Sequence, residues 1–168
     1  MNTLLITGVT GFLGGAVLEN ILNNENGINL LLLVRANNDE AALARVKENL
    51  RKFNIAEEKL AALTPRQILL GDLSSPETFL SDPRLEQVTH VINSAAVASF
   101  GNNPLIWKVN VEGTFKFAQR MSRVAGLQRF LHVGTAMSCT PEPDSLVAES
   151  AEFREHAEHL VEYTHSKS

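Results

Sequence analysis

The chain has 168 residues, a formal net charge of −4 and a single cysteine, Cys139. Hydrophobic residues make up 44% and charged residues 20%, as in ordinary globular proteins. The acidic balance gives no reason to expect a nucleic-acid partner, and the longest apolar run, residues 30–34, is too short to span a membrane. One cysteine excludes an internal disulfide and fits a reducing compartment. We therefore expect a cytoplasmic protein with no membrane span.

Short apolar runs alternate with helical patterns along the chain. Continuous apolar strands separated by helices indicate a parallel sheet covered on both faces, and right-handed crossovers favour a doubly wound, Rossmann-type α/β fold. The predicted strands cover residues 3–7, 29–34, 67–70, 88–93 and 129–133. The predicted helices include residues 16–22, 38–53, 104–125 and 152–167, with Gly126 as the C-cap of the third.

A glycine-rich turn, Thr-Gly-Val-Thr-Gly-Phe-Leu-Gly at residues 7–14, joins the first strand to the first helix. Gly8 permits the tight turn, Gly11 lets the backbone approach a pyrophosphate, and Gly14 lets the helix pack closely on the strand. The helix N-terminus offers free N–H groups to phosphates. An ordinary strand-to-helix turn is the alternative, but a place between a strand and a helix is the context that favours dinucleotide binding.

Arg35 stands at the end of the second strand, where an acidic residue usually binds the ribose hydroxyls of NAD. An arginine in that place suits the 2′-phosphate of NADP. Arg45, on the following helix, either supplies a second cation or is a solvated helix residue.

Tyr163, the only tyrosine, stands four residues before Lys167. Residues four apart share one face of a helix, and a neighbouring ammonium favours the phenolate that proton transfer needs. The pair indicates carbonyl–alcohol redox chemistry, with a chance pair on a solvated helix as the alternative. The histidines nearby, His156, His159 and His165, lack the spacing of zinc-protease helix motifs, so no metal site is predicted.

Taken together, these motifs resemble the extended branch of the short-chain dehydrogenase/reductase superfamily. Within that branch the chain is most similar to the thioester-reductase and fatty acyl-CoA reductase group, also called male-sterility-type reductases. The resemblance covers residues 1–168. It rests on the turn at 7–14, Leu-Leu-Val-Arg-Ala at 32–36, Gly-Asp-Leu at 71–73, Asn-Ser-Ala-Ala at 93–96, Asn-Val-Glu-Gly-Thr at 110–114 and Tyr-Thr-His-Ser-Lys at 163–167.

The resemblance implies that residues 1–168 form an NADP(H)-binding domain, with NAD(H) as the alternative cofactor. In it, Tyr163 would be the general acid and Lys167 would assist it and bond the nicotinamide ribose. Thr135 would hold the substrate carbonyl oxygen, and Asn110 would support the helix and a proton-relay water. The implied cofactor-binding residues are Gly8, Thr10, Gly11, Phe12, Leu13, Gly14, Arg35, Arg45, Asp72, Leu73, Ser94, Ala95, Ala96, Tyr163 and Lys167.

The implied activity is NADPH-dependent reduction of an acyl thioester, either a fatty acyl-CoA or a carrier-bound acyl group, or of the derived aldehyde. Two alternatives stay open: an NAD-dependent sugar-nucleotide epimerase, dehydratase or hydroxysteroid-type dehydrogenase, and a non-catalytic NADP-binding module. The non-catalytic alternative is supported by residues 134–140. They read Gly-Thr-Ala-Met-Ser-Cys-Thr, where relatives usually carry Ser-Thr-Ala-Tyr-Val-x-Gly.

Family members normally continue with further strands and a substrate-binding segment, and neither is present in this sequence. We therefore expect the N-terminal part of a longer reductase, weak or inactive by itself. The fifth strand would then lack its next neighbour, and this open apolar edge would favour self-association.

Overall fold

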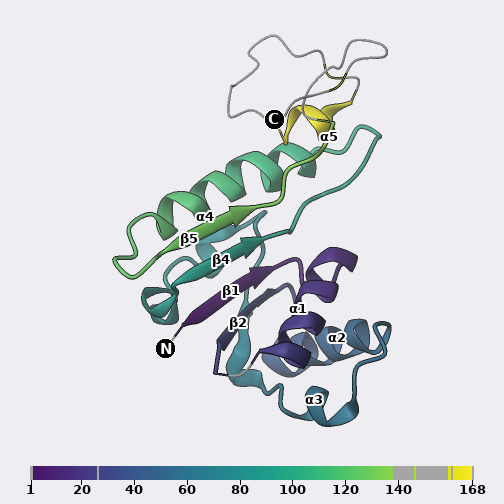
Figure 1. The fold of residues 1–168 in the computed structure, drawn as a ribbon. Coiled ribbons are helices and arrows are strands. Elements are labelled where there is room, and N and C mark those ends of the chain that lie inside the picture. The colour runs from purple at the N-terminus through teal and green to yellow at the C-terminus, as the bar shows by residue number, and fades with distance from the viewer. Residues whose placement is uncertain (1, 26, 138–145, 147–158, 160, 168) are drawn as a thin grey trace.

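The computed structural model describes residues 2–25, 27–137, 146, 159 and 161–167 (Figure 1). Five strands, all parallel, form one sheet in the order β3-β2-β1-β4-β5. This order confirms the predicted Rossmann-type sheet and places β1 at its centre. The strands are β1 (Thr3–Thr7), β2 (Asn29–Val34), β3 (Ile68–Leu70), β4 (His90–Asn93) and β5 (Arg129–His132).

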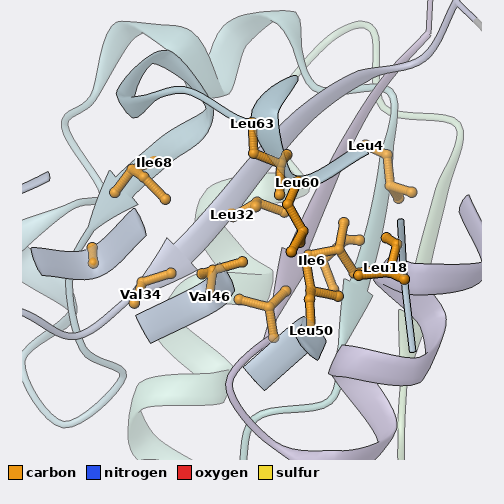
Figure 2. Packing of buried hydrophobic residues seen from close by; sticks show 13 residues of the cluster. Leu4, Ile6, Leu18, Leu32, Val34, Val46, Leu50, Leu60, Leu63 and Ile68 are labelled. Carbon is orange, nitrogen blue, oxygen red and sulfur yellow. The ribbon is translucent and has the colours of Figure 1, made fainter. Parts of the chain in front are cut away.

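Helices cover both faces of the sheet. Alternate residues of a strand point to opposite faces, so Leu4 and Ile6 pack with Leu18 of α1 in one apolar cluster, drawn in Figure 2, while Leu5 packs with Phe117 of α4 in the other. The helices are α1 (Phe12–Asn24), α2 (Asp39–Arg51), α3 (Glu57–Ala61), α4 (Thr114–Met121) and α5 (Glu162–His165), with a π-helix at Trp107–Gly113 and 3₁₀ turns at Pro65–Gln67, Pro76–Thr78 and Pro83–Gln87.

Several predicted bounds are wrong where a turn replaces regular structure. The third strand begins at Ile68 because residues 65–67 form a 3₁₀ turn, and the fourth begins at His90 after another 3₁₀ turn. The third predicted helix ends at Met121 with Ser122 as its C-cap, so Gly126 is not the cap. Within that helix, the Thr114 hydroxyl donates to the Val109 carbonyl oxygen at 3.0 Å, five residues back, at the wide turn of the π-helix.

The closing helix is also shorter than predicted. Val161 has an extended backbone, and the helix begins only at Glu162. The amide of Ser166 still donates to the carbonyl of Glu162, but that of Lys167 donates to Thr164, three residues back, which closes the helix with a tighter turn. Residues 152–158 and 160 of this prediction, like Cys139 and His156, lie outside the described residues.

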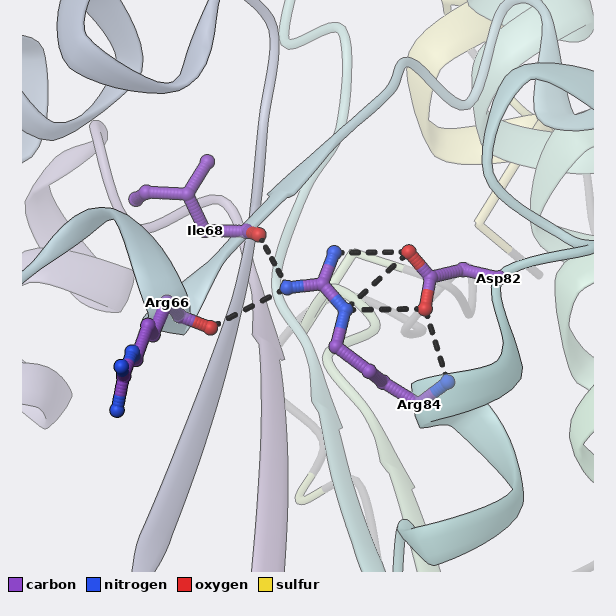
Figure 3. Close-up of polar contacts among 4 residues, drawn as sticks. All are labelled: Arg66, Ile68, Asp82 and Arg84. Carbon is purple, nitrogen blue, oxygen red and sulfur yellow. Dashed lines mark hydrogen bonds and ion pairs between the residues drawn. The ribbon is translucent and has the colours of Figure 1, made fainter.

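Arg84 ties the 3₁₀ turn at Pro83–Gln87 to the start of β3 (Figure 3). Its guanidinium donates to the carbonyl oxygens of Ile68 at 2.8 Å and Arg66 at 3.2 Å, and pairs with the Asp82 carboxylate at 2.8 Å. The hydrogen bond from Arg84 holds the pKa of Asp82 below its ordinary value. This contact lies at the amino ends of the strands and is structural.

β5 lies at one edge of the sheet, and no described strand pairs with its outer side. Leu131 of β5 is 51% exposed and stands in register with Ile92 of β4. A shallow, mainly apolar pocket of about 270 Å³ lies at Leu4, Ile92 and Leu131. In the described part of the fold, β5 therefore has an open edge, as the sequence predicts, and the apolar side chain of Leu131 is exposed on the sheet face beside it. No helix in that part is long and apolar enough to cross a membrane.

Candidate functional site

A pocket of about 340 Å³ lies at the carboxyl ends of β1, β2, β3 and β4. In open α/β sheets, ligands bind at this edge where the strand order reverses, here between β1 and β4. Leu105 and Val109, from the helical segment after β4, add an apolar side. Of the predicted cofactor residues, the pocket is lined by Gly8, Thr10, Gly11, Arg35, Arg45, Asp72, Leu73, Ser94, Ala95 and Ala96.

The glycine turn has no room for side chains at two positions. Gly8 has φ +75°, and a Cβ there would lie 2.7 Å from Ser94 Oγ and 2.8 Å from the Ala95 nitrogen. A Cβ on Gly14 would lie 2.3 Å from the Gly8 carbonyl oxygen. The Gly11 amide donates to the same carbonyl at 2.9 Å and closes the turn. The backbone therefore forms the wall of the pocket here, as a phosphate cradle requires.

α1 begins at Phe12, and no side chain caps its first turn. The first-turn amides of a helix have no intrahelical partner and carry partial positive charge, which suits an anionic ligand. The side chains of Phe12 and Leu13 are largely exposed, at 84% and 48%, and Phe12 packs against Phe53 with ring centroids 5.8 Å apart. Neither Phe12 nor Leu13 is among the described residues that line the pocket, so both would contribute only their backbone amides to a ligand.

Asn49 of α2 holds the glycine turn in place through hydrogen bonds. The sequence did not lead us to predict this role. Its buried amide nitrogen donates to the carbonyl oxygens of Val9 and Gly11, each at 3.0 Å. The signal was available, because Asn49 lies on the same helix face as the buried Ala42 and Val46, and a polar residue on such a face needs a partner.

Two arginines stand where β2 ends. The Arg35 guanidinium lies 3.4 Å from Asp72 Oδ2, and the Arg35 side chain is 73% exposed. The second oxygen of Asp72 accepts the Ser74 amide at 3.0 Å. Arg45 donates to the carbonyl oxygen of Arg35. A guanidinium has five N–H donors, so these contacts leave donors on both arginines for a ligand phosphate.

The segment after β4 is held against β1 by Thr7, another residue that the sequence reasoning missed. The Ser94 hydroxyl donates to the Thr7 carbonyl oxygen at 2.7 Å, and the Ala95 amide donates to Thr7 Oγ1 at 3.0 Å. Ser94, Ala95 and Ala96 are thereby fixed beside the glycine turn, in the same pocket.

Two of the predicted catalytic residues, Lys167 and Thr135, lie near the end of β5. Lys167 Nζ donates to the Val133 carbonyl oxygen at 2.9 Å, and burial lowers the pKa of this lysine. Thr135 Oγ1 accepts the Met137 amide at 3.2 Å. The Tyr163 ring meets Phe100 edge to face, with centroids 6.0 Å apart. No hydrogen bond among the described residues joins Tyr163 to Thr135 or Lys167.

Asn110 connects three segments around this region. Buried in the π-helix, it accepts the Val97 amide at 2.8 Å and donates to the Val97 carbonyl at 3.2 Å and to Ser166 Oγ at 2.9 Å. Ser166 Oγ in turn donates to the Tyr163 carbonyl at 2.8 Å. Asn110 thus anchors α5 to the segment that follows β4, and π-turns are frequent at functional sites.

The pocket has a backbone cradle at one end and two guanidinium groups at the other, and both suit the phosphate groups of a dinucleotide. The fold and this pocket define a Rossmann-type dinucleotide-binding domain.

Comparison with known proteins identifies the family of the chain. Residues 6–168 match the family model described as male sterility protein, an NAD-binding domain. The chain belongs to this family.

Two of the relatives are named as a reductase and a synthase. The chain is 29% identical to "Fatty acyl-CoA reductase 8" of Arabidopsis thaliana, over 86% of the chain and 32% of that protein. It is 33% identical to the "Isonitrile lipopeptide synthase" of Mycobacterium tuberculosis, over 92% of the chain and 6% of that protein. The chain therefore spans about a third of the length of the plant relative.

A solved structure shares the fold. The terminal R domain from the myxalamid PKS-NRPS biosynthetic pathway superposes with a TM-score of 0.81 at 22% identity, over 99% of the chain and 43% of that domain.

Proposed function

We propose that residues 1–168 form the NADP(H)-binding and catalytic part of a reductase that acts on an acyl thioester, bound to coenzyme A or to a carrier protein, or on the derived aldehyde. The observation that carries this proposal is that the glycine turn, Arg35 and Arg45 line the same pocket. The names of the relatives support the substrate class: a fatty acyl-CoA reductase and a lipopeptide synthase both handle acyl groups.

The cofactor would lie along the pocket from α1 to the end of β2. The backbone of Gly11, Phe12 and Leu13 would hold the pyrophosphate, and Asp72 with Leu73 would flank the adenine. Arg35 and Arg45 would bind the 2′-phosphate, because guanidinium groups form strong, charge-assisted hydrogen bonds with phosphate oxygens. When bound, the reduced cofactor supplies the hydride that reduces the carbonyl carbon.

Proton transfer would be the task of Tyr163. Its hydroxyl would donate a proton to the carbonyl oxygen while the Thr135 hydroxyl donates a hydrogen bond to the same atom. Lys167 would keep its ammonium beside this site, where burial already disfavours the charged form and lowers its pKa. Asn110 would hold α5 in place through Ser166.

A non-catalytic NADP-binding module is the second candidate, and two contacts favour it. The Lys167 ammonium is engaged by the Val133 carbonyl, and the Tyr163 ring contacts Phe100. Cofactor binding with no turnover would match that arrangement. The NAD-dependent epimerase or dehydrogenase alternative is weaker. NAD-binding domains usually have an acidic residue at the end of β2 that accepts hydrogen bonds from the ribose hydroxyls, and the two arginines here can only donate.

The test measures cofactor binding and turnover in the purified protein. NADPH should bind more tightly than NADH, and NADPH should be oxidised in the presence of an acyl-CoA or a carrier-bound thioester. Tyr163→Phe should lower turnover by at least about 100-fold, the usual effect of losing a general acid, while NADPH binding persists. Turnover that survives this substitution would overturn the assignment of the acid. A preference for NADH would overturn the cofactor assignment, and binding without turnover on thioesters and aldehydes would favour the non-catalytic module.

A further inference from the structure

Three polar residues end adjacent strands in one row across the sheet. Thr7 of β1 is in register with Asn93 of β4, and Asn93 is in register with His132 of β5. Two residues earlier in the strands, the register partners Val91 and Phe130 both pack in the cluster beneath α4. Because side chains alternate with a period of two, the row from Thr7 to His132 lies on that same face, at the carboxyl ends where the pocket opens.

The hydrogen bonds along this row run in one direction, with the Asn93 amide oriented so that its oxygen faces Thr7. The Ala95 amide can only donate, and it donates to Thr7 Oγ1 at 3.0 Å. The Thr7 hydroxyl passes its own hydrogen to Asn93 Oδ1 at 2.6 Å. The other end of the Asn93 amide, Nδ2, is a donor and lies 3.1 Å from His132 Nδ1. His132 Nδ1 must therefore be an acceptor, which makes the imidazole neutral with its proton on Nε2.

A protonated His132 does not fit this row. Both ring nitrogens of an imidazolium are donors. The Nδ1–H group would then point at the Asn93 Nδ2–H group, and two donors cannot form a hydrogen bond. On β4, the neighbour of His132 is the uncharged Asn93. After α5, the neighbour is the cationic Lys167, whose Nζ donates to the carbonyl of Val133, the residue next to His132. The side chain of His132 stays exposed on one side, and the pKa of His132 is lowered first by partial desolvation against the end of the sheet and then by the Lys167 charge. The surroundings therefore favour the neutral ring.

We infer that His132 is a positioning residue: its neutral ring accepts the Asn93 amide and thereby steadies the Ala95 segment of the pocket, and protonation in mild acid releases that segment and weakens binding of the dinucleotide. The inference rests on the proposed function for the identity of the ligand, and on the row of hydrogen bonds for the mechanism. It makes His132, which is not among the residues that line the pocket, a determinant of cofactor affinity.

The experiment measures the affinity for NADP⁺, which is stable in acid, between pH ~5 and ~8, where histidine titrates. His132→Asn places a non-titrating amide oxygen near the position of Nδ1, and His132→Phe keeps a ring with no acceptor. The ligand phosphate also titrates in this range, but it does so equally in every variant. We expect affinity to fall more steeply with acid in the wild type than in His132→Asn. His132→Phe should bind about 5- to 10-fold more weakly at neutral pH, as expected for one lost hydrogen bond.

His90→Asn is the matched control, because His90 lies at the opposite end of β4 and bonds the Thr89 hydroxyl at 2.9 Å. This variant should keep the wild-type pH slope. Equal slopes in the wild type and His132→Asn would overturn the inference.

A measurement without cofactor separates this inference from the proposed function. In ¹⁵N NMR spectra of the free protein, His132 should carry its proton on Nε2 at neutral pH, and the Ala95 amide resonance should shift as the ring titrates. The Ala95 shift should be absent in His132→Asn. An Nδ1–H tautomer would overturn the inference even if NADP⁺ binds. So would an Ala95 amide resonance whose chemical shift does not change as the His132 ring titrates. Failure of the wild type to bind NADP⁺ would instead count against the proposed function, and the NMR result would still decide the coupling.

Discussion

The side-chain amide of Asn49 donates to the carbonyl oxygen of Gly11 at 3.0 Å and so fastens α2 to the residue that immediately precedes α1. The same nitrogen bonds the carbonyl of Val9. One buried side chain thus sets the shape of the turn whose backbone forms the wall of the pocket. The turn whose amides would face a phosphate is thus held by a residue 38 positions away.

Asn49→Asp should loosen this turn, because it replaces the donor with a carboxylate that faces two carbonyl oxygens. We expect a loss of stability of about 1–3 kcal/mol, the usual cost of an unsatisfied buried polar group, and NADPH binding weakened by at least about 10-fold. Urea unfolding and fluorescence titration would measure the two effects. Asn20→Asp, at an exposed position of α1, should change neither, and equal effects in both variants would contradict the role of Asn49.

Arg35→Ala should weaken NADPH binding by about 10- to 100-fold and leave NADH binding nearly unchanged, because a charge-assisted hydrogen bond to the 2′-phosphate is worth about 1.5–3 kcal/mol. Calorimetric titration with both cofactors would measure the ratio. Arg123→Ala, an exposed arginine that does not line the pocket, is the matched control. Equal losses for NADPH and NADH would show that Arg35 does not read the 2′-phosphate.

Gly14→Ala should destabilise the protein and impair cofactor binding together. The added Cβ would lie 2.3 Å from the Gly8 carbonyl oxygen, so the start of α1 must move away from the turn. Overpacking of this kind costs about 1–3 kcal/mol. Gly126→Ala is the control, since nothing lies within 4 Å of its Cβ position, and thermal unfolding of both variants would test the difference. A Gly14→Ala protein as stable as Gly126→Ala would contradict the close contact.

Lys167→Met should abolish turnover and remove a pH dependence of stability. Burial lowers the pKa of Lys167 in the folded protein, so between that value and the ordinary lysine pKa the unfolded chain binds more protons. Stability contributed by this group therefore rises as pH rises through the window and is lost as pH falls. Urea unfolding at neutral and alkaline pH should show a smaller rise in Lys167→Met than in the wild type. An unchanged pH dependence would contradict the burial of the ammonium.

Leu131→Lys should reduce self-association. Leu131 is half exposed on the edge strand β5, and a charge on an edge strand disfavours pairing with a second sheet. Sedimentation velocity over a range of concentrations should show an oligomer for the wild type and a monomer for the variant. Phe115→Lys, an exposed apolar position on α4, should not dissociate the oligomer. A wild type that is monomeric at all concentrations would contradict the prediction.

Elements with a local signal were predicted well. The strand at residues 29–34 has the bounds that its apolar run indicates, and the helix at Asp39–Arg51 lies within the predicted range 38–53. Asn38 explains where that helix starts, because its side chain accepts the Ala41 amide at 2.8 Å. The closing helix was predicted less well: Val161 is extended and the helix begins only at Glu162, so helical propensity did not decide the backbone at residue 161.

Three features can be deduced from the amino-acid sequence: the succession of strands and helices along the chain, the burial of the apolar runs of β1 and β2, and the turn that accepts little but glycine at residues 8 and 14. Each of these follows from short-range sterics and periodicity. The tertiary structure alone decided which polar groups meet: Arg35 with Asp72, Asn49 with Gly11, and Asn93 with His132, which are 37, 38 and 39 residues apart. Such pairs depend on strand register and helix packing, which arise only when the whole sheet assembles, and no local pattern specifies them.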